Sequence, residues 1–135
     1  MGRVTAEITL SNPMDKVRVQ EGIRSRIREV TVTAIVDTGA STIIINEELQ
    51  QQLGLEIEGK RRTTFADGGQ KECGLTEGIK IHWKNRHTTC NAVVIPGAKS
   101  VLLGAIPLED MDLIINPLKQ ELIGAHGEVV EALAL

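Results

Sequence analysis

The chain has 135 residues, a net charge of −3, one Phe, one Trp and no Tyr. This length suits one domain with a workable core, so we expect a single domain over residues 1–135. The negative charge and the scarcity of aromatic rings leave little surface for phosphates or stacked bases, so we expect no nucleic-acid partner.

Alternating polarity predicts a strand near the start of the chain. Val4, Ala6, Ile8 and Leu10 alternate with polar residues, which is the pattern of a strand with one buried face. The Asn-Pro pair at residues 12–13 ends it. Beyond this point Arg24, Arg26 and Arg28 also alternate, and we interpret them as a solvated strand face instead of a nucleic-acid site.

A second strand, at residues 30–36, is β-branched and ends on a carboxylate, Asp37. Gly39 follows in a short turn, where glycine can take backbone angles closed to other residues and lets another chain approach closely. Asp, Thr and Gly also favour Asx-type turns for local hydrogen-bonding reasons, so an isolated triplet of this kind has a purely structural explanation.

A short strand and a short helix are predicted directly after this turn. Residues 42–45 are apolar enough for a buried strand, and Asn46 is a suitable N-cap for a helix that ends at Gly54. Further along, the Asp-Gly pair at residues 67–68 is a hairpin turn signal.

The last third of the sequence predicts a hairpin, a helix and two more strands. Residues 79–83 alternate and pair with 90–95 across a turn at Asn85-Arg86. Residues 107–111 suit a short helix opened by Pro107, and strands follow at 112–115 and 119–123. Residues 124–135 fit either a mobile tail or a dimer strand, and the sequence does not choose between them.

Three motifs together resemble those of retropepsin-like aspartic proteases. An apolar strand followed by Asp-Thr-Gly-Ala at 37–40 resembles the active-site turn of that family. The apolar segment ending in Gly at 102–104 is similar to the one that packs behind this turn, and residues 65–73 resemble the flap that covers bound substrate. The resemblance spans about residues 30–124. The candidate site residues are Asp37 (catalytic), Thr38, Gly39 and Ala40 (active-site turn), Phe65, Ala66, Asp67, Gly68 and Gly69 (flap), and Leu102, Leu103 and Gly104 (support).

The resemblance implies an all-β fold, a closed β-barrel with one or two short helices, that acts as a homodimer. One chain carries one Asp-Thr-Gly, so each copy would contribute Asp37 to a pair on the two-fold axis. Such a pair shares one proton and activates a water molecule against a peptide bond. Thr38 would reach across the axis, and Gly39 would admit water and substrate. The implied function is an aspartic endopeptidase whose partner is a peptide or protein substrate, with no metal and no cofactor.

The chain also departs from the retroviral members of this family. They carry further acidic residues soon after the Ala of the turn, whereas this chain has Ser41 and Thr42. The flap is also more polar, with Lys71 and Glu72 close to its tip. A catalytically silent, dimeric peptide-binding or scaffold domain of the same fold is therefore the alternative hypothesis, and the intact Asp-Thr-Gly favours the enzyme.

Two further expectations concern metals and location. Cysteine and histidine occur at Cys73, His82, His87 and Cys90, but without the short paired spacing of a zinc site, so we expect no metal. The beginning of the chain lacks the apolar core of a signal peptide, and no segment is long and apolar enough to cross a bilayer. Two cysteines do not make a disulfide framework. We therefore expect a cytoplasmic protein with no membrane partner.

Overall fold

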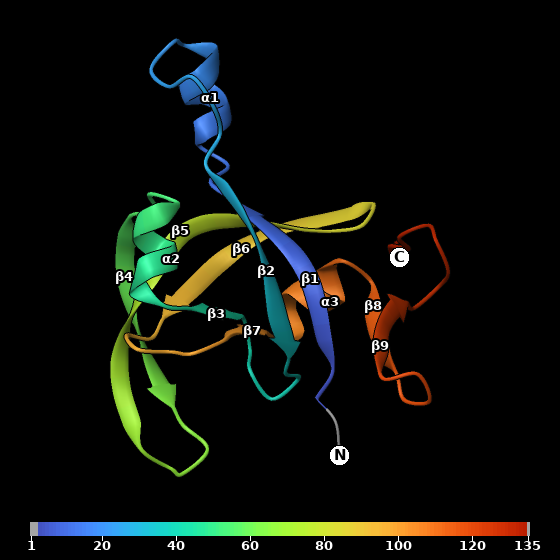
Figure 1. Ribbon diagram of the computed structural model, residues 1–135. Helices are drawn as coiled ribbons and strands as arrows, with labels where there is room; N and C mark the ends of the chain where they lie inside the picture. Colours follow the sequence, from blue (N-terminus) through green and yellow to red (C-terminus); the bar gives the residue numbers. More distant parts are fainter. Residues whose placement is uncertain (1–2, 135) are drawn as a thin grey trace.

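The computed structural model describes residues 3–134, which form nine strands and three short helices (Figure 1). The strands are β1 (Thr5–Ser11), β2 (Glu29–Val36), β3 (Ile43–Ile45), β4 (Ile57–Thr64), β5 (Gln70–Trp83), β6 (Arg86–Val94), β7 (Val101–Leu103), β8 (Leu113–Asn116) and β9 (Glu121–Gly124). The helices are α1 (Asp15–Gln20), α2 (Glu47–Gln52) and α3 (Ala105–Asp110).

Six of the strands close into a barrel, which confirms the predicted fold class. The sheet runs in the order β1-β2-β7-β3-β6-β5, and a second pairing of β1 with β5 closes it. This closing contact is short, because it joins only residues 9–11 of β1 to residues 80–82 of β5. Strand β4 lies outside the ring and pairs only with β5. The β4–β5 hairpin is therefore an extension of the barrel wall.

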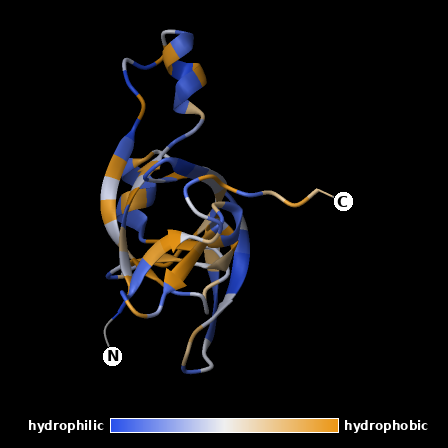
Figure 2. Ribbon diagram, turned by 90° about the vertical axis from the view of Figure 1, so that its right-hand side faces the viewer, coloured by the Kyte–Doolittle hydropathy of each residue, from blue (hydrophilic) through white to orange (hydrophobic). Residues whose placement is uncertain are grey.

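The interior of the barrel is filled by aliphatic side chains from the alternating strands. On β1, Ala6, Ile8 and Leu10 are buried, as the alternation predicted. Figure 2 shows the hydrophobic stretches gathered inside the barrel. The largest apolar side chains with almost no exposure are Ile8, Leu10, Ile43, Ile45, Leu53, Leu55, Ile79, Ile81, Leu103 and Met111. Burial of this apolar surface is the main force that holds the barrel together.

Helix α2 forms where its capping residue predicted it. The Asn46 side chain accepts a hydrogen bond from the backbone N–H of Leu49, with an Oδ1–N distance of 2.9 Å. This bond satisfies one of the amides that a helix start leaves without a partner. The chain then leaves the helix at Gly54, whose φ of +65° lies in the left-handed region.

The prediction of a strand face at Arg24, Arg26 and Arg28 was wrong. Residues 12–28, which we call the knob, project from one end of the barrel and contain α1, a helix that the sequence did not reveal (Figure 1). The arginines lie in the irregular part of the knob, where Arg28 turns inward to the fully buried Asp15. Arg24 and Arg28 share Asp15 as their counter-charge, whereas Arg26 is exposed and forms no ion pair within residues 3–134, so their alternation does not mark a strand.

Asp15 is the centre of the knob. Arg28 binds its carboxylate with two parallel hydrogen bonds, Nε to Oδ2 at 2.9 Å and Nη2 to Oδ1 at 3.0 Å, and Arg18 adds a third at 2.9 Å. These bonds, chiefly those from Arg28, hold the pKa of the Asp15 carboxyl well below its usual range. A buried carboxylate is tolerated only with such partners. The ion pair therefore ties α1 to the end of the knob and holds the two ends of the knob together.

The remaining predictions differ from the structure mainly at element ends. The turn between β5 and β6 is at Lys84-Asn85, one residue early, and α3 begins at Ala105, two residues before Pro107. Residues 125–134 form no strand within this chain. In the described range 3–134 there is no helix long and apolar enough to span a membrane.

Candidate active site

The turn that carries Asp37 sits where three barrel strands meet. Strand β7 lies between β2, with which it is parallel, and β3, with which it is antiparallel. The Asp37 backbone N–H donates to the Leu103 carbonyl at 3.0 Å, so the residue just past β2 is tied to the end of β7. Asp37 itself is half-buried, whereas Thr38 and Gly39 are exposed. The barrel thus presents one carboxylate at its rim.

The Asp37 carboxylate is oriented by its own turn. Its Oδ1 accepts a hydrogen bond from the Gly39 backbone N–H at 2.9 Å, and the Asp37 carbonyl accepts one from Ala40 N–H at 3.1 Å. This is the Asx-type turn that the triplet also allowed. In the described residues no other hydrogen bond or ion pair reaches this carboxylate, so its second oxygen is free to act on a ligand.

Of the two properties expected to matter at Gly39, special backbone angles and the lack of a side chain, only the second is used. The φ of Gly39 is not in the left-handed region, so the turn does not depend on backbone angles closed to other residues. What the position needs is space, because a Cβ on Gly39 would lie 3.2 Å from Asp37 Oδ1. The absence of a side chain keeps the approach to the carboxylate open.

The predicted supporting segment does lie behind the turn. Leu103 is fully buried and pairs with Val36 on one side and Ile43 on the other. A Cβ on Gly104 would clash with the carbonyl oxygens of Ala40 and Thr42, so only glycine fits there. The first residues of α3 complete the support, because Ala105 N–H donates to the Ala40 carbonyl at 2.8 Å and Ile106 N–H to that of Ser41 at 2.9 Å.

The predicted flap is the tip of the β4–β5 hairpin. Phe65 N–H donates to the Gly69 carbonyl at 2.8 Å, and Gly68, at φ +87°, donates to the Phe65 carbonyl at 2.9 Å. Phe65 is partly buried, and residues 66–72 are exposed. In Figure 1 this tip and the Asp37 turn lie at the same end of the molecule, opposite the knob.

A small cavity of about 130 Å³ adjoins the Asp37 turn. No pattern in the sequence predicted this cavity, because its lining residues come from the segment after the Asp37 turn, from three strands and from a helix that lie far apart in the chain. Thr42 helps to form its wall, since its hydroxyl donates to the Asn91 carbonyl at 2.7 Å. The lining residues are Ser41, Thr42, Arg61, Leu75, Cys90, Asn91, Val93 and Ile106.

The four residues considered for zinc do not converge. His82 and His87 stack with ring centroids 5.4 Å apart near the β5–β6 turn. Cys73 is buried on β5, and burial raises the pKa of the Cys90 thiol, which lies beside Thr42. Among residues 3–134, no three His, Cys, Asp or Glu side chains are grouped to hold a metal ion.

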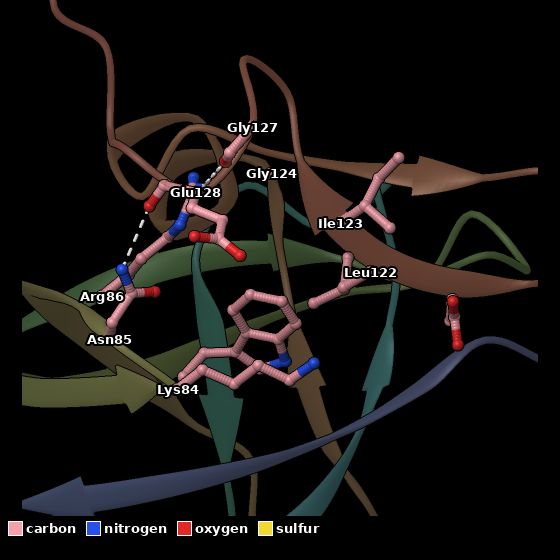
Figure 3. Close-up of a pocket in the computed structure, with 10 residues that line it drawn as sticks. Lys84, Asn85, Arg86, Leu122, Ile123, Gly124, Gly127 and Glu128 are labelled. Atoms are coloured by element: carbon pink, nitrogen blue, oxygen red, sulfur yellow. Dashed lines mark hydrogen bonds between the residues drawn. The ribbon is translucent and has the colours of Figure 1, made fainter.

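A larger cavity of about 620 Å³ lies away from the Asp37 turn (Figure 3). It lies between the β5–β6 turn and the C-terminal segment, by which we mean residues 121–134. Its anchor is the buried Arg86, whose Nη1 donates to the carbonyls of Met111 at 2.9 Å and Asp112 at 2.7 Å, and whose Nη2 donates to that of Gly127. Asn85 binds the Glu128 carbonyl at 3.0 Å. None of the predicted site residues lines this cavity, and its polar contacts fasten the C-terminal segment to the barrel.

Comparison with known families agrees with this geometry. The family model described as gag-polyprotein putative aspartyl protease matches residues 23–125, well over half of the chain. The chain belongs to this retropepsin-like aspartic protease family. The matched span of the aspartyl protease domain includes the Asp37 turn, the β4–β5 hairpin and the segment behind the turn. A search of curated proteins gave no match.

Proposed function

We propose that this aspartyl protease domain is an endopeptidase that acts as a homodimer, with Asp37 of each copy forming the catalytic pair. The observation that carries the proposal is the Asp37 carboxylate, fixed by Leu103 and Gly39 at the rim of the barrel with one oxygen free. One copy supplies one such turn. A two-fold axis through the rim would place the same group of each copy face to face.

The chemistry of the proposed pair follows from its electrostatics. Two carboxylates a few ångström apart repel when both are ionised, so the pair retains one proton. The ionised Asp37 takes a proton from a water molecule as its oxygen attacks the scissile carbonyl carbon. The protonated Asp37 donates a hydrogen bond to the carbonyl oxygen and stabilises the charge that develops there.

The neighbouring residues have supporting roles in this proposal. Thr38 is exposed beside Asp37 and would contact its counterpart across the axis, which keeps the two turns rigid. Gly39 leaves room for the water molecule and the peptide. The tip of the β4–β5 hairpin, from Phe65 to Gly69, would close over the bound peptide and exclude bulk water.

Peptide-library cleavage tests the activity. Mass spectrometry should find cleaved peptides with the wild-type protein and none with Asp37→Asn, because the amide keeps the shape of the side chain but cannot accept the proton. Glu48→Gln is the matched control, since it removes an exposed carboxylate from α2 and should cleave like the wild type. Equal cleavage by Asp37→Asn would contradict the assignment.

Mixing experiments test whether the pair comes from two copies. Equilibration with a ninefold excess of Asp37→Asn would leave only about a tenth of the wild-type copies paired with each other, so hydrolysis should fall to about a tenth. The same excess of an unrelated protein should change nothing. Undiminished activity in the mixture would show that a single copy is sufficient and would rule out the dyad.

A further inference from the structure

A small cavity lies beside the turn that carries Asp37. It begins at Ser41 and Thr42, directly after the turn, and continues between β4, β6 and α3. Its volume of about 130 Å³ is close to that of the cavity, roughly 150 Å³, that takes up a benzene ring in another protein. The cavity therefore has room for one side chain of a peptide held at Asp37.

The lining of the cavity has two different parts. Leu75, Val93 and Ile106 offer apolar contacts for the methylene groups of a side chain. The polar part includes Ser41 and Thr42, which directly follow the turn. Among the residues that line the cavity none is acidic, so nothing in the wall repels an anion.

Arg61 gives the cavity its charge. It is the one charged residue of the lining, it is exposed on β4, and within residues 3–134 it forms no ion pair. Across the hairpin it faces Cys73, whereas its neighbour Arg62 faces Glu72. The nearby Glu58 does not line the cavity, and Asn91 Nδ2 donates to its carboxylate at 3.1 Å. Arg61 therefore keeps a free positive charge for a ligand.

We propose that this cavity selects an acidic side chain of the peptide and that Arg61 determines the selection. The inference rests on the proposed peptidase function, which it extends by naming the substrate class. A Glu or Asp side chain lays its methylene groups on the apolar wall and brings its carboxylate to the guanidinium of Arg61. A Lys side chain at the same position meets a like charge.

Charge reversal tests the role of Arg61. Three peptide series carry Glu, Gln or Lys in turn at each position around the scissile bond. For the wild type, kcat/KM should favour Glu over Lys at one position by about fivefold, the upper range for an exposed ion pair. Arg61→Glu should invert the preference at that position only. Arg62→Glu, the matched control on the same strand, should keep the wild-type ratio. The wild-type preference should also shrink in high salt.

The outcomes separate this inference from the proposed function. Cleavage without a preference for Glu, or an unchanged ratio in Arg61→Glu, overturns the inference and leaves the peptidase intact. If no peptide is cleaved, fluorescence anisotropy of the same labelled peptides with the Asp37→Asn protein and with its Arg61→Glu double variant decides the question. Tighter binding of Glu peptides that is lost with Arg61→Glu supports the inference although the peptidase proposal fails. Absence of any selective binding overturns it.

Discussion

Gly104 lies so close to Ala40 that a β-carbon on the glycine would stand 2.5 Å from the Ala40 carbonyl oxygen. This contact joins the end of β7 to the last residue of the Asp37 turn. Because the Ala40 carbonyl also accepts a hydrogen bond from Ala105, the turn cannot move away from Gly104 without losing that bond. The position of the Asp37 carboxylate thus depends on a missing side chain behind it.

Replacing Gly104 with Ala should destabilise the protein. The methyl group would meet backbone oxygens, which cannot move aside as a flexible side chain can, and overpacking of this kind costs about 1–3 kcal/mol. Urea denaturation measures the loss. Gly59→Ala is the control, because a Cβ there meets nothing within 4 Å, and its unfolding free energy should stay close to that of the wild type. Equal stability of the two variants would contradict the packing argument.

The β4–β5 hairpin should move as a cover. The backbone amides of Ala66 and Asp67 at its tip donate to no group in the described residues, so hydrogen exchange should be fast there in the free protein. A transition-state mimic of peptide hydrolysis should slow it. Exchange at the buried strand β1 is the internal control and should not change. A tip that is protected without ligand, or unprotected with it, would show that residues 65–73 do not cover the site.

Asp15 should make the stability of the knob depend on acid. Its folded-state pKa is lowered by the arginines, so its contribution is present above the ordinary carboxyl pKa and is lost as the pH falls below about 4. Asp15→Asn should cost about 3 kcal/mol at pH 7, because Arg28 loses its counter-charge. The gap between wild type and variant in urea denaturation should narrow towards pH 2. Glu21→Gln, an exposed change in the knob, should show no such gap.

His126 should titrate above its usual range. A hydrogen bond between its Nδ1 and Asp112 at 2.9 Å raises its pKa, so the bond stabilises the C-terminal segment below about pH 6.5 and weakens as the pH rises through the raised value. NMR titration of the ring protons should show the raised pKa, and Asp112→Asn should return it to the usual range. Asn suits this site because Asp112 has a φ of +54°. An unchanged titration in the variant would rule out the contact.

Local signals in the sequence predicted β1, β2, β3 and the β5–β6 hairpin, whereas the segment that forms β7 was identified only through the family resemblance. Alternation marked Ala6, Ile8 and Leu10, and a single Asn46 marked the start of α2. The knob escaped prediction because its order comes from Asp15 and Arg28, thirteen residues apart, and no periodicity reports such a pair. The cavity at Arg61 escaped for the same reason, since β4, β6 and α3 meet there only after the chain has folded.

Strand β5 belongs to two structures at once. The later residues of β5 are part of the closed barrel, and its earlier residues form one strand of the β4–β5 hairpin. The pairing of β5 with β6 shifts register between Leu75 and Gly78. We expect the hairpin to bend relative to the barrel at this irregular stretch, because the barrel part of β5 is held by its neighbours on both sides. We expect a displacement of the hairpin tip by a bound peptide to be taken up by bending of β5 in the Leu75–Gly78 stretch, while the barrel stays closed.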